Sequence, residues 1–142
     1  MTIKERTDAI KEEFSQFDDW MDKYNYLIEM GNDLPLLDEE QKTKQNLISG
    51  CQSRVWLHAS YEDGLIHFRA DSDAVITKGI AALLVRVFSE QKPDDILNAG
   101  TEFIDEIGLK DHLSPTRSNG LMSMIKQMKL YALAFKTKKE QT

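Results

Sequence analysis

The chain has 142 residues, 41% of them hydrophobic and 30% charged, which is typical of one globular domain over residues 1–142. Its net charge of −6 argues against a nucleic-acid binder, which would present Lys and Arg to phosphates, and against binding to an anionic membrane surface. No apolar run is long enough to span a membrane, the N-terminus lacks the apolar centre of a signal peptide, and a single cysteine excludes an internal disulfide. We therefore expect a cytoplasmic protein.

The first third of the chain shows helical periodicity. One helix is predicted by three apolar residues at helical spacing: Ile10, Phe14 and Phe17. Asp19 is expected to cap a second helix, which Gly31 ends as a left-handed stop before a turn at residues 32–35. Residues 38–45 are almost wholly polar, so a loop or a solvated helical turn follows.

Alternation of apolar and polar residues in the middle of the chain predicts a β-hairpin. Residues 53–60 are rich in β-formers, and residues 65–70 return with a second alternating run. Between them, Glu62-Asp63-Gly64 is a turn signal because glycine accepts positive φ. Two strands alone are only marginally stable, so we expect either a third strand or helices that cover one face.

Helical periodicity resumes after the hairpin. Ser72 is expected to cap a helix over residues 73–89, and short helices are predicted at 94–98 and 102–107. Ser114-Pro115 begins a last helix that reaches Phe135, followed by a charged, frayed tail at 136–142. The predicted fold class is α/β of the α+β type, with a small antiparallel sheet flanked by helices. Two glycines inside helical patterns predict close backbone packing: Gly79 and Gly120.

Cys51 is the first candidate for chemistry. It lies between Ser49-Gly50 and Gln52-Ser53, a polar hinge at the entry to the first strand, and reactive groups commonly lie on such loops. A lone cysteine in a cytoplasmic protein is also commonly an inert core residue, so both interpretations stand here.

Two charged residues are further candidates. Arg117 falls in the first turn of the last helix, where the helix dipole disfavours a cation, so it either faces an anion or thiolate or pairs with a nearby acid at the surface. Asp71 lies beside the predicted cap Ser72, where an acid stabilises a helix without further purpose. The three histidines lack the spacing of a metal site: His58, His67 and His112.

Three motifs resemble the SufE family of cysteine desulfuration proteins, over a core of about residues 19–134. The motifs are Gly50-Cys51-Gln52-Ser53-Arg54-Val55-Trp56-Leu57, Ala70-Asp71-Ser72-Asp73-Ala74 and Leu113-Ser114-Pro115-Thr116-Arg117-Ser118-Asn119-Gly120-Leu121. Thr116 is a mild variation of the third motif. The resemblance implies the family fold, which is also that of the IscU-type iron–sulfur scaffolds.

The resemblance also implies a function. Cys51 would take sulfur as a persulfide from a SufS-type cysteine desulfurase, stimulate that enzyme, and pass the sulfur to an iron–sulfur scaffold such as SufBCD, with Arg117 and Asp71 as further site residues. The chain would be a partner-dependent sulfur-transfer protein rather than an enzyme, with no cofactor or metal of its own, since pyridoxal phosphate belongs to the desulfurase. One thiol suits a carrier better than a cluster scaffold or a dithiol oxidoreductase.

Two other classes of function stay open at this point. The chain is alternatively a cysteine-dependent hydrolase or acyl carrier, with Cys51 activated by one of the three histidines, or a binding module in which Cys51 is structural. A carrier would shield its persulfide, so we expect Cys51 to be partly buried in the free protein and to move outward when the desulfurase docks. The apolar surface expected to shield it comes from its neighbours in sequence: Leu47, Ile48, Val55 and Trp56.

Overall fold

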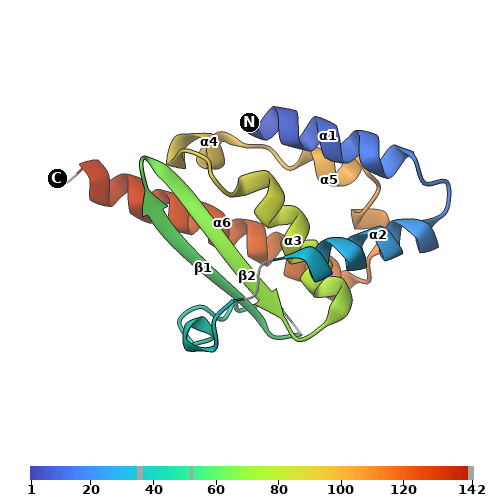
Figure 1. Ribbon diagram of the computed structural model, residues 1–142, viewed down its shortest axis with the longest axis horizontal. Coiled ribbons are helices and arrows are strands. Elements are labelled where there is room, and N and C mark those ends of the chain that lie inside the picture. The colour runs from blue at the N-terminus through green and yellow to red at the C-terminus, as the bar shows by residue number, and fades with distance from the viewer. Residues whose placement is uncertain (35–36, 52, 141–142) are drawn as a thin grey trace.

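The alternating residues in the middle of the chain form an antiparallel hairpin. The computed structural model, which describes residues 1–34, 37–51 and 53–140, pairs β1 (Val55–Glu62) with β2 (Leu65–Ser72) over their whole length (Figure 1). Asp63 and Gly64 both have positive φ, of 55° and 79°, as a two-residue hairpin turn requires. The predicted hairpin and its turn are therefore confirmed.

One face of the hairpin packs against helices α3 (Val75–Phe88) and α6 (Pro115–Glu140). The residues that point to this core are nearly fully buried: Val55, Leu57, Ile66, Phe68 and Ala70. In the described part of the chain the sheet has only these two strands, and covering helices supply the stability that a third strand would have given. Single bridges, Leu47 with Trp56 and Ile66 with Gln91, protect the two outer edges.

Helix α2 (Trp20–Asp33) begins where the sequence predicts. The Asp19 carboxylate accepts a hydrogen bond from the Met21 N–H at 2.7 Å, which is a helix N-cap. The prediction that Gly31 stops this helix is wrong, because Gly31 lies inside it and faces α3. A Cβ on Gly31 would lie 3.0 Å from Gly79 N, and one on Gly79 would lie 2.3 Å from Leu27 O. The close packing predicted for Gly79 is therefore confirmed, and Gly31 serves the same contact from the other side.

The remaining helices surround this centre (Figure 1). They are α1 (Ile3–Ser15), η1 (Glu39–Gln41), α4 (Pro93–Asn98), α5 (Glu102–Glu106) and η2 (Lys110–His112). The prediction that Ser72 caps α3 is wrong. Ser72 is the last residue of β2, and its hydroxyl donates a hydrogen bond to Arg54 O at 2.8 Å. Helix α6 does not end near Phe135 but continues to Glu140. The expected turn residue Pro35, the expected hinge residue Gln52 and residues 141–142 lie outside the described part.

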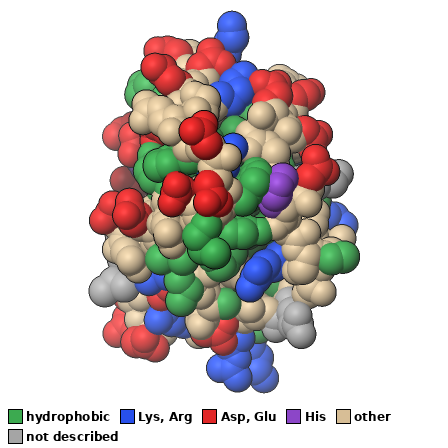
Figure 2. Space-filling model, turned by 90° about the vertical axis from the view of Figure 1, so that its right-hand side faces the viewer, with side chains coloured by type: hydrophobic (Ala, Val, Ile, Leu, Met, Phe, Trp, Pro, Cys, Tyr) green, Lys and Arg blue, Asp and Glu red, His purple; other side chains and the backbone are tan. Residues whose placement is uncertain are grey.

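The surface reflects the acidic composition. On the face at the right of Figure 1, hydrophobic side chains gather at the centre, and Asp and Glu side chains lie around them with a few Lys and Arg (Figure 2). Among the described residues, no helix combines the length and the apolar character needed to cross a bilayer. The architecture is α+β with a small antiparallel sheet, as predicted.

Candidate functional site

Cys51 lies on a short loop whose two ends are held together. The Ile48 N–H donates to Val55 O, and the Leu57 N–H donates to Asn46 O, both at 2.8 Å. On the strand side, the Arg54 N–H donates to the Asp73 carboxylate at 3.0 Å. Main-chain bonds thus close the base of the loop on both sides of Cys51.

Gly50 fits the loop against helix α6. Its φ is +91°, in the region that favours glycine, and a Cβ at this position would lie 2.6 Å from Ser123 Oγ. The backbone conformation therefore favours glycine, and the lack of a side chain lets the loop lie close to Ser123. The contact with Ser123 could not be read from the motif.

The Cys51 thiol is partly buried and lies against α6. Its Sγ is 3.7 Å from Gly120 O, which accepts its weak hydrogen bond. A Cβ on Gly120 would lie 3.4 Å from the same sulfur, so the glycine leaves room above it. Burial raises the pKa of the Cys51 thiol above its ordinary value. At neutral pH the free protein therefore holds a neutral thiol, not a thiolate.

Polar residues from three elements surround the thiol in a cavity of about 320 Å³. Besides Cys51, the cavity is lined by Ser53, Thr77, Ser114, Thr116, Arg117 and Gly120. The lining includes none of the four apolar residues expected to shield the thiol. Gly120 of α6 contacts the thiol, and Thr77 of α3 lines the same cavity.

Arg117 reaches this cavity because of how α6 begins. The Ser114 hydroxyl accepts a hydrogen bond from the Arg117 N–H at 3.3 Å, as a capping residue does, so Pro115 and Arg117 occupy the first turn. The Arg117 side chain is exposed, and no ion pair involves it among the described residues. The structure thus brings Arg117 and Cys51 to one cavity, while burial alone accounts for the raised pKa of the thiol.

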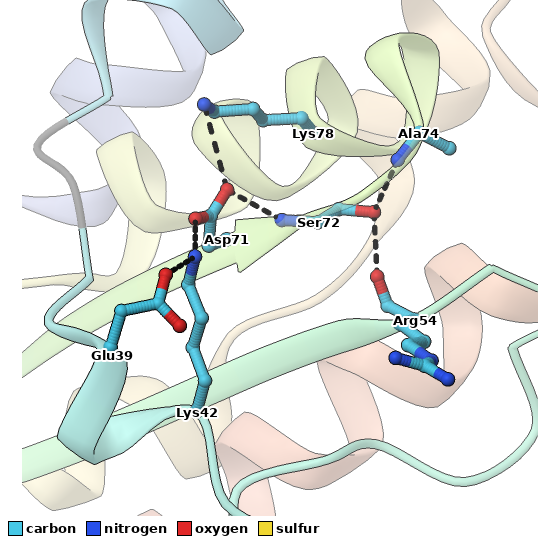
Figure 3. A network of polar contacts seen from close by, with 7 residues as sticks. All are labelled: Glu39, Lys42, Arg54, Asp71, Ser72, Ala74 and Lys78. Atoms are coloured by element: carbon cyan, nitrogen blue, oxygen red, sulfur yellow. Dashed lines mark hydrogen bonds and ion pairs between the residues drawn. The ribbon is translucent and has the colours of Figure 1, made fainter.

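Asp71 belongs to a different cluster, at the end of the sheet (Figure 3). Its carboxylate lies 3.0 Å from Lys42 Nζ and 3.5 Å from Lys78 Nζ, and accepts a hydrogen bond from the Ser72 N–H at 2.8 Å. Burial pushes the pKa of this carboxyl upward, but the bonds from Lys42 and Ser72 and the charge of Lys78 outweigh it and hold the pKa below its usual range. Asp71 therefore ties η1 and α3 to the sheet and does not line the Cys51 cavity.

The three histidines also lie apart from the thiol. His58 and His67 share the outer face of the hairpin without being paired, and His112 stacks on Trp20 with ring centroids 3.8 Å apart. None of them lines the Cys51 cavity. No histidine in the described part of the chain is therefore placed to act as the general base of a cysteine hydrolase at Cys51. In the same part, no three His, Cys, Asp or Glu residues could together hold a metal ion.

Thr77 is the cavity residue that sequence reasoning missed. It lies in the first turns of α3, where apolar residues predominate, and the residue is only 8% exposed. The only sign of Thr77 in the sequence is a polar hydroxyl among the apolar residues on the buried side of the helix. Recognising it required knowing which side of α3 faces Cys51.

Comparison with known proteins agrees with the motifs. A family model described as "SufE: Fe-S metabolism associated domain" matches residues 8–132. An uncharacterized SufE-like protein of Rhizobium meliloti is 40% identical over 127 residues, covering 86% of this chain and 91% of that protein. SufE-like protein 1, chloroplastic/mitochondrial, of Arabidopsis thaliana is 42% identical over 120 residues, which cover 84% of this chain and 32% of the plant protein.

The fold also has a solved counterpart. The solution structure of a hypothetical protein from Thermus thermophilus superposes with a TM-score of 0.78, covering 93% of this chain and 96% of that one. Because the two sequences are only 19% identical, this likeness concerns the fold alone.

Proposed function

Because the chain belongs to the SufE family and thus to iron–sulfur metabolism, we propose that it accepts sulfur on Cys51 from a partner cysteine desulfurase and passes it to cluster assembly. The observation that carries this proposal is the position of the only thiol in the sequence. Cys51 lies on a short loop, partly buried, beside a cavity with room for one more atom on its sulfur. A purely structural cysteine would not need that room.

The transfer is a thiolate attack on a persulfide. Cys51 loses its proton, and its sulfur attacks the outer sulfur of the desulfurase persulfide. A new S–S bond forms on Cys51 while the S–S bond on the desulfurase breaks, and the desulfurase cysteine leaves as a thiolate. No external oxidant or reductant is consumed, because the number of S–S bonds stays the same.

The neutral thiol of the free protein sets a requirement on docking. The pKa of Cys51 is raised by burial, so the thiolate forms more readily once the loop brings the sulfur out of its partly buried position. Arg117, exposed at the rim of the same cavity, would contact the desulfurase near the transfer site. We assign it this role rather than stabilisation of a thiolate in the free protein.

The partners follow from the same proposal. The donor would be a SufS-type desulfurase, which carries the pyridoxal phosphate, and the acceptor an iron–sulfur scaffold such as SufBCD in the cytoplasm. The chain itself would need no resident cofactor and would act only with these partners. Asp71 is left out of the transfer chemistry because it lies in the lysine cluster and not beside the thiol.

Mass measurement after reaction tests the proposal directly. The protein is incubated with a SufS-type desulfurase and cysteine, and its intact mass is recorded before and after reductant. We expect a gain of one sulfur on Cys51 that reductant removes, together with faster turnover of the desulfurase. Cys51→Ser should show neither effect. Unlabelled protein beside a desulfurase that is itself persulfidated would contradict the proposal.

A further inference from the structure

Helix α6 presents an exposed apolar stripe outside the Cys51 cavity. Met122, Leu130 and Leu133 are exposed by 41%, 47% and 50%. Together with Lys126 they follow the spacing i, i+4, i+8 and i+11, so the four residues share one face of the helix over about three turns. Single exposed hydrophobic residues are ordinary, but a group of them on one helix face is typical of an interaction surface.

The stripe forms one wall of a groove of about 400 Å³, where α4 packs against α6 (Figure 1). Leu97 and Thr101 line the groove from the side of α4, and the buried Ile125 lines it from α6. Lys129 ties the two sides together, because its Nζ donates to Leu97 O at 3.4 Å and to Ala99 O at 2.5 Å. The groove is therefore formed in the free protein and needs no partner to create it.

The groove is basic as well as apolar. Its lining includes two lysines and no acid. The ammonium of Lys129 is bonded to carbonyl oxygens, but Lys126 is exposed, and no ion pair involves it in the described part of the chain. Helix α6 carries six Lys or Arg residues and one acid, in a chain with 18 Lys and Arg against 24 Asp and Glu. The complementary occupant is therefore apolar on one face and acidic beside it.

We propose that this groove docks an amphipathic helix of a partner protein whose apolar stripe is flanked by Asp and Glu. The stripe from Met122 to Leu133 is about 16 Å long, which matches three turns of a partner helix with apolar residues at i, i+4, i+7 and i+11. A symmetric pair of two copies of this chain through the same groove would bring lysines beside lysines, which disfavours that occupant.

The docking groove is separate from the transfer site. Met122 follows Gly120, the residue that contacts the thiol, by only two positions, but the groove and the Cys51 cavity share no lining residue. A helix bound in the groove thus contacts none of the residues that line the thiol's cavity. The inference therefore does not depend on sulfur transfer.

Two synthetic helical peptides of about 18 residues test the proposal. Both carry the same leucine stripe, which is flanked by glutamates in one peptide and by lysines in the other. Each is titrated into the ¹⁵N-labelled full chain, and binding is followed by the shifts of backbone amide signals. We expect the glutamate peptide to shift the signals of residues 97–101 and 122–133, and to bind about tenfold more tightly than the lysine peptide.

Three variants at exposed positions separate the apolar and charged contributions. Leu130→Ser should weaken binding of the glutamate peptide about tenfold. Lys126→Glu should weaken the glutamate peptide and strengthen the lysine peptide, because it reverses the charge at the edge of the stripe. Met21→Ser is the matched control, since Met21 is 63% exposed on α2 and does not line the groove, and it should bind like wild type.

Equal binding of the two peptides overturns the proposal, as does absence of binding or binding that Leu130→Ser leaves unchanged. Sedimentation of the protein alone and binding to vesicles of anionic lipid test the other occupants. Self-association or vesicle binding that Leu130→Ser abolishes would assign the groove to a second copy or to a lipid surface, and would overturn the proposal. Cys51→Ser should bind the glutamate peptide like wild type, so this result is independent of the mass test for sulfur acceptance.

Discussion

Replacing Gly79 by alanine would place a methyl group between α2 and α3. The new Cβ would lie 2.3 Å from Leu27 O and 2.8 Å from Leu27 C, where ordinary contacts begin at 3.4 Å. The two helices would have to separate by about 1 Å at this point, because backbone atoms cannot rotate away as a flexible side chain can.

The size of the effect follows from two opposing terms. Overpacking of this kind costs about 1–3 kcal/mol, and the backbone contact places Gly79→Ala at the upper end. Alanine has a higher helix propensity than glycine, which stabilises the folded protein by about 1 kcal/mol. We therefore expect the free energy of unfolding to fall by about 2 kcal/mol, which corresponds to a urea midpoint lower by about 1 M.

Gly120→Ala is the matched control, since it is the same substitution inside another helix. Its Cβ would meet nothing closer than Cys51 Sγ at 3.4 Å, so only the helix-propensity term acts. We expect this variant to be more stable by up to about 1 kcal/mol. Urea unfolding followed by circular dichroism measures the free energy of unfolding of both variants. If the two substitutions changed it in the same direction, the close approach of α2 and α3 at Gly79 would be refuted.

Further outcomes are expected at three residues: Asp71, Cys51 and Arg117. Asp71→Asn should unfold about 2 kcal/mol more easily at neutral pH and yet accept sulfur normally, and a loss of sulfur acceptance by the folded variant would place Asp71 in the transfer chemistry. Because its folded pKa is lowered, the wild-type protein should lose this contribution as pH falls below about 4 and through the folded pKa, while Asp71→Asn should not. Because burial raises the pKa of the Cys51 thiol, alkylation of the native protein should reach half its maximal rate at higher pH than in urea, and equal midpoints would show an unshielded thiol. The same raised pKa should make wild type lose stability as pH rises above about 8.5, a loss that Cys51→Ala should lack. Arg117→Ala should slow sulfur acceptance while changing the free energy of unfolding by less than about 0.5 kcal/mol. Unchanged transfer kinetics would show that Arg117 is a solvated surface residue with no role in the transfer.

Local signals predicted the elements whose ends depend on local chemistry. Alternating residues and Gly64 gave the hairpin, Asp19 gave the start of α2, and Ser114 with Pro115 gave the start of α6. In each of these cases the residue that decides the structure bonds to a neighbour in sequence, or imposes its own backbone angle.

Long-range contacts decided the features that were predicted wrongly. A glycine at the position of Gly31 is typical of a helix end, but this glycine is needed because Gly79 of another helix packs against it. Ser72 looks like a cap, yet the strand continues through it because its hydroxyl is bonded to Arg54 O across the hairpin. Neither partner is visible in the local pattern.

The candidate site divides in the same way. The motifs singled out Cys51 and Arg117, and the fold brings both to one cavity. Asp71 came from a motif as well, but its surroundings depend on Lys42 and Lys78, which approach it from separate elements. Thr77 carried no motif and is recognised only from its burial beside the thiol.

The closed base of the Cys51 loop limits how far the sulfur can travel. Cys51 lies three positions after the anchored Ile48, so even a fully extended segment carries its Cα no more than about 10 Å from that anchor. A tether this short keeps the sulfur near one small area of the surface. In the proposed transfer, donor and acceptor would each approach this same area, so their binding would be mutually exclusive. Each sulfur atom would then require one full cycle of association and dissociation, and an excess of either partner would inhibit the transfer by occupying the shared surface.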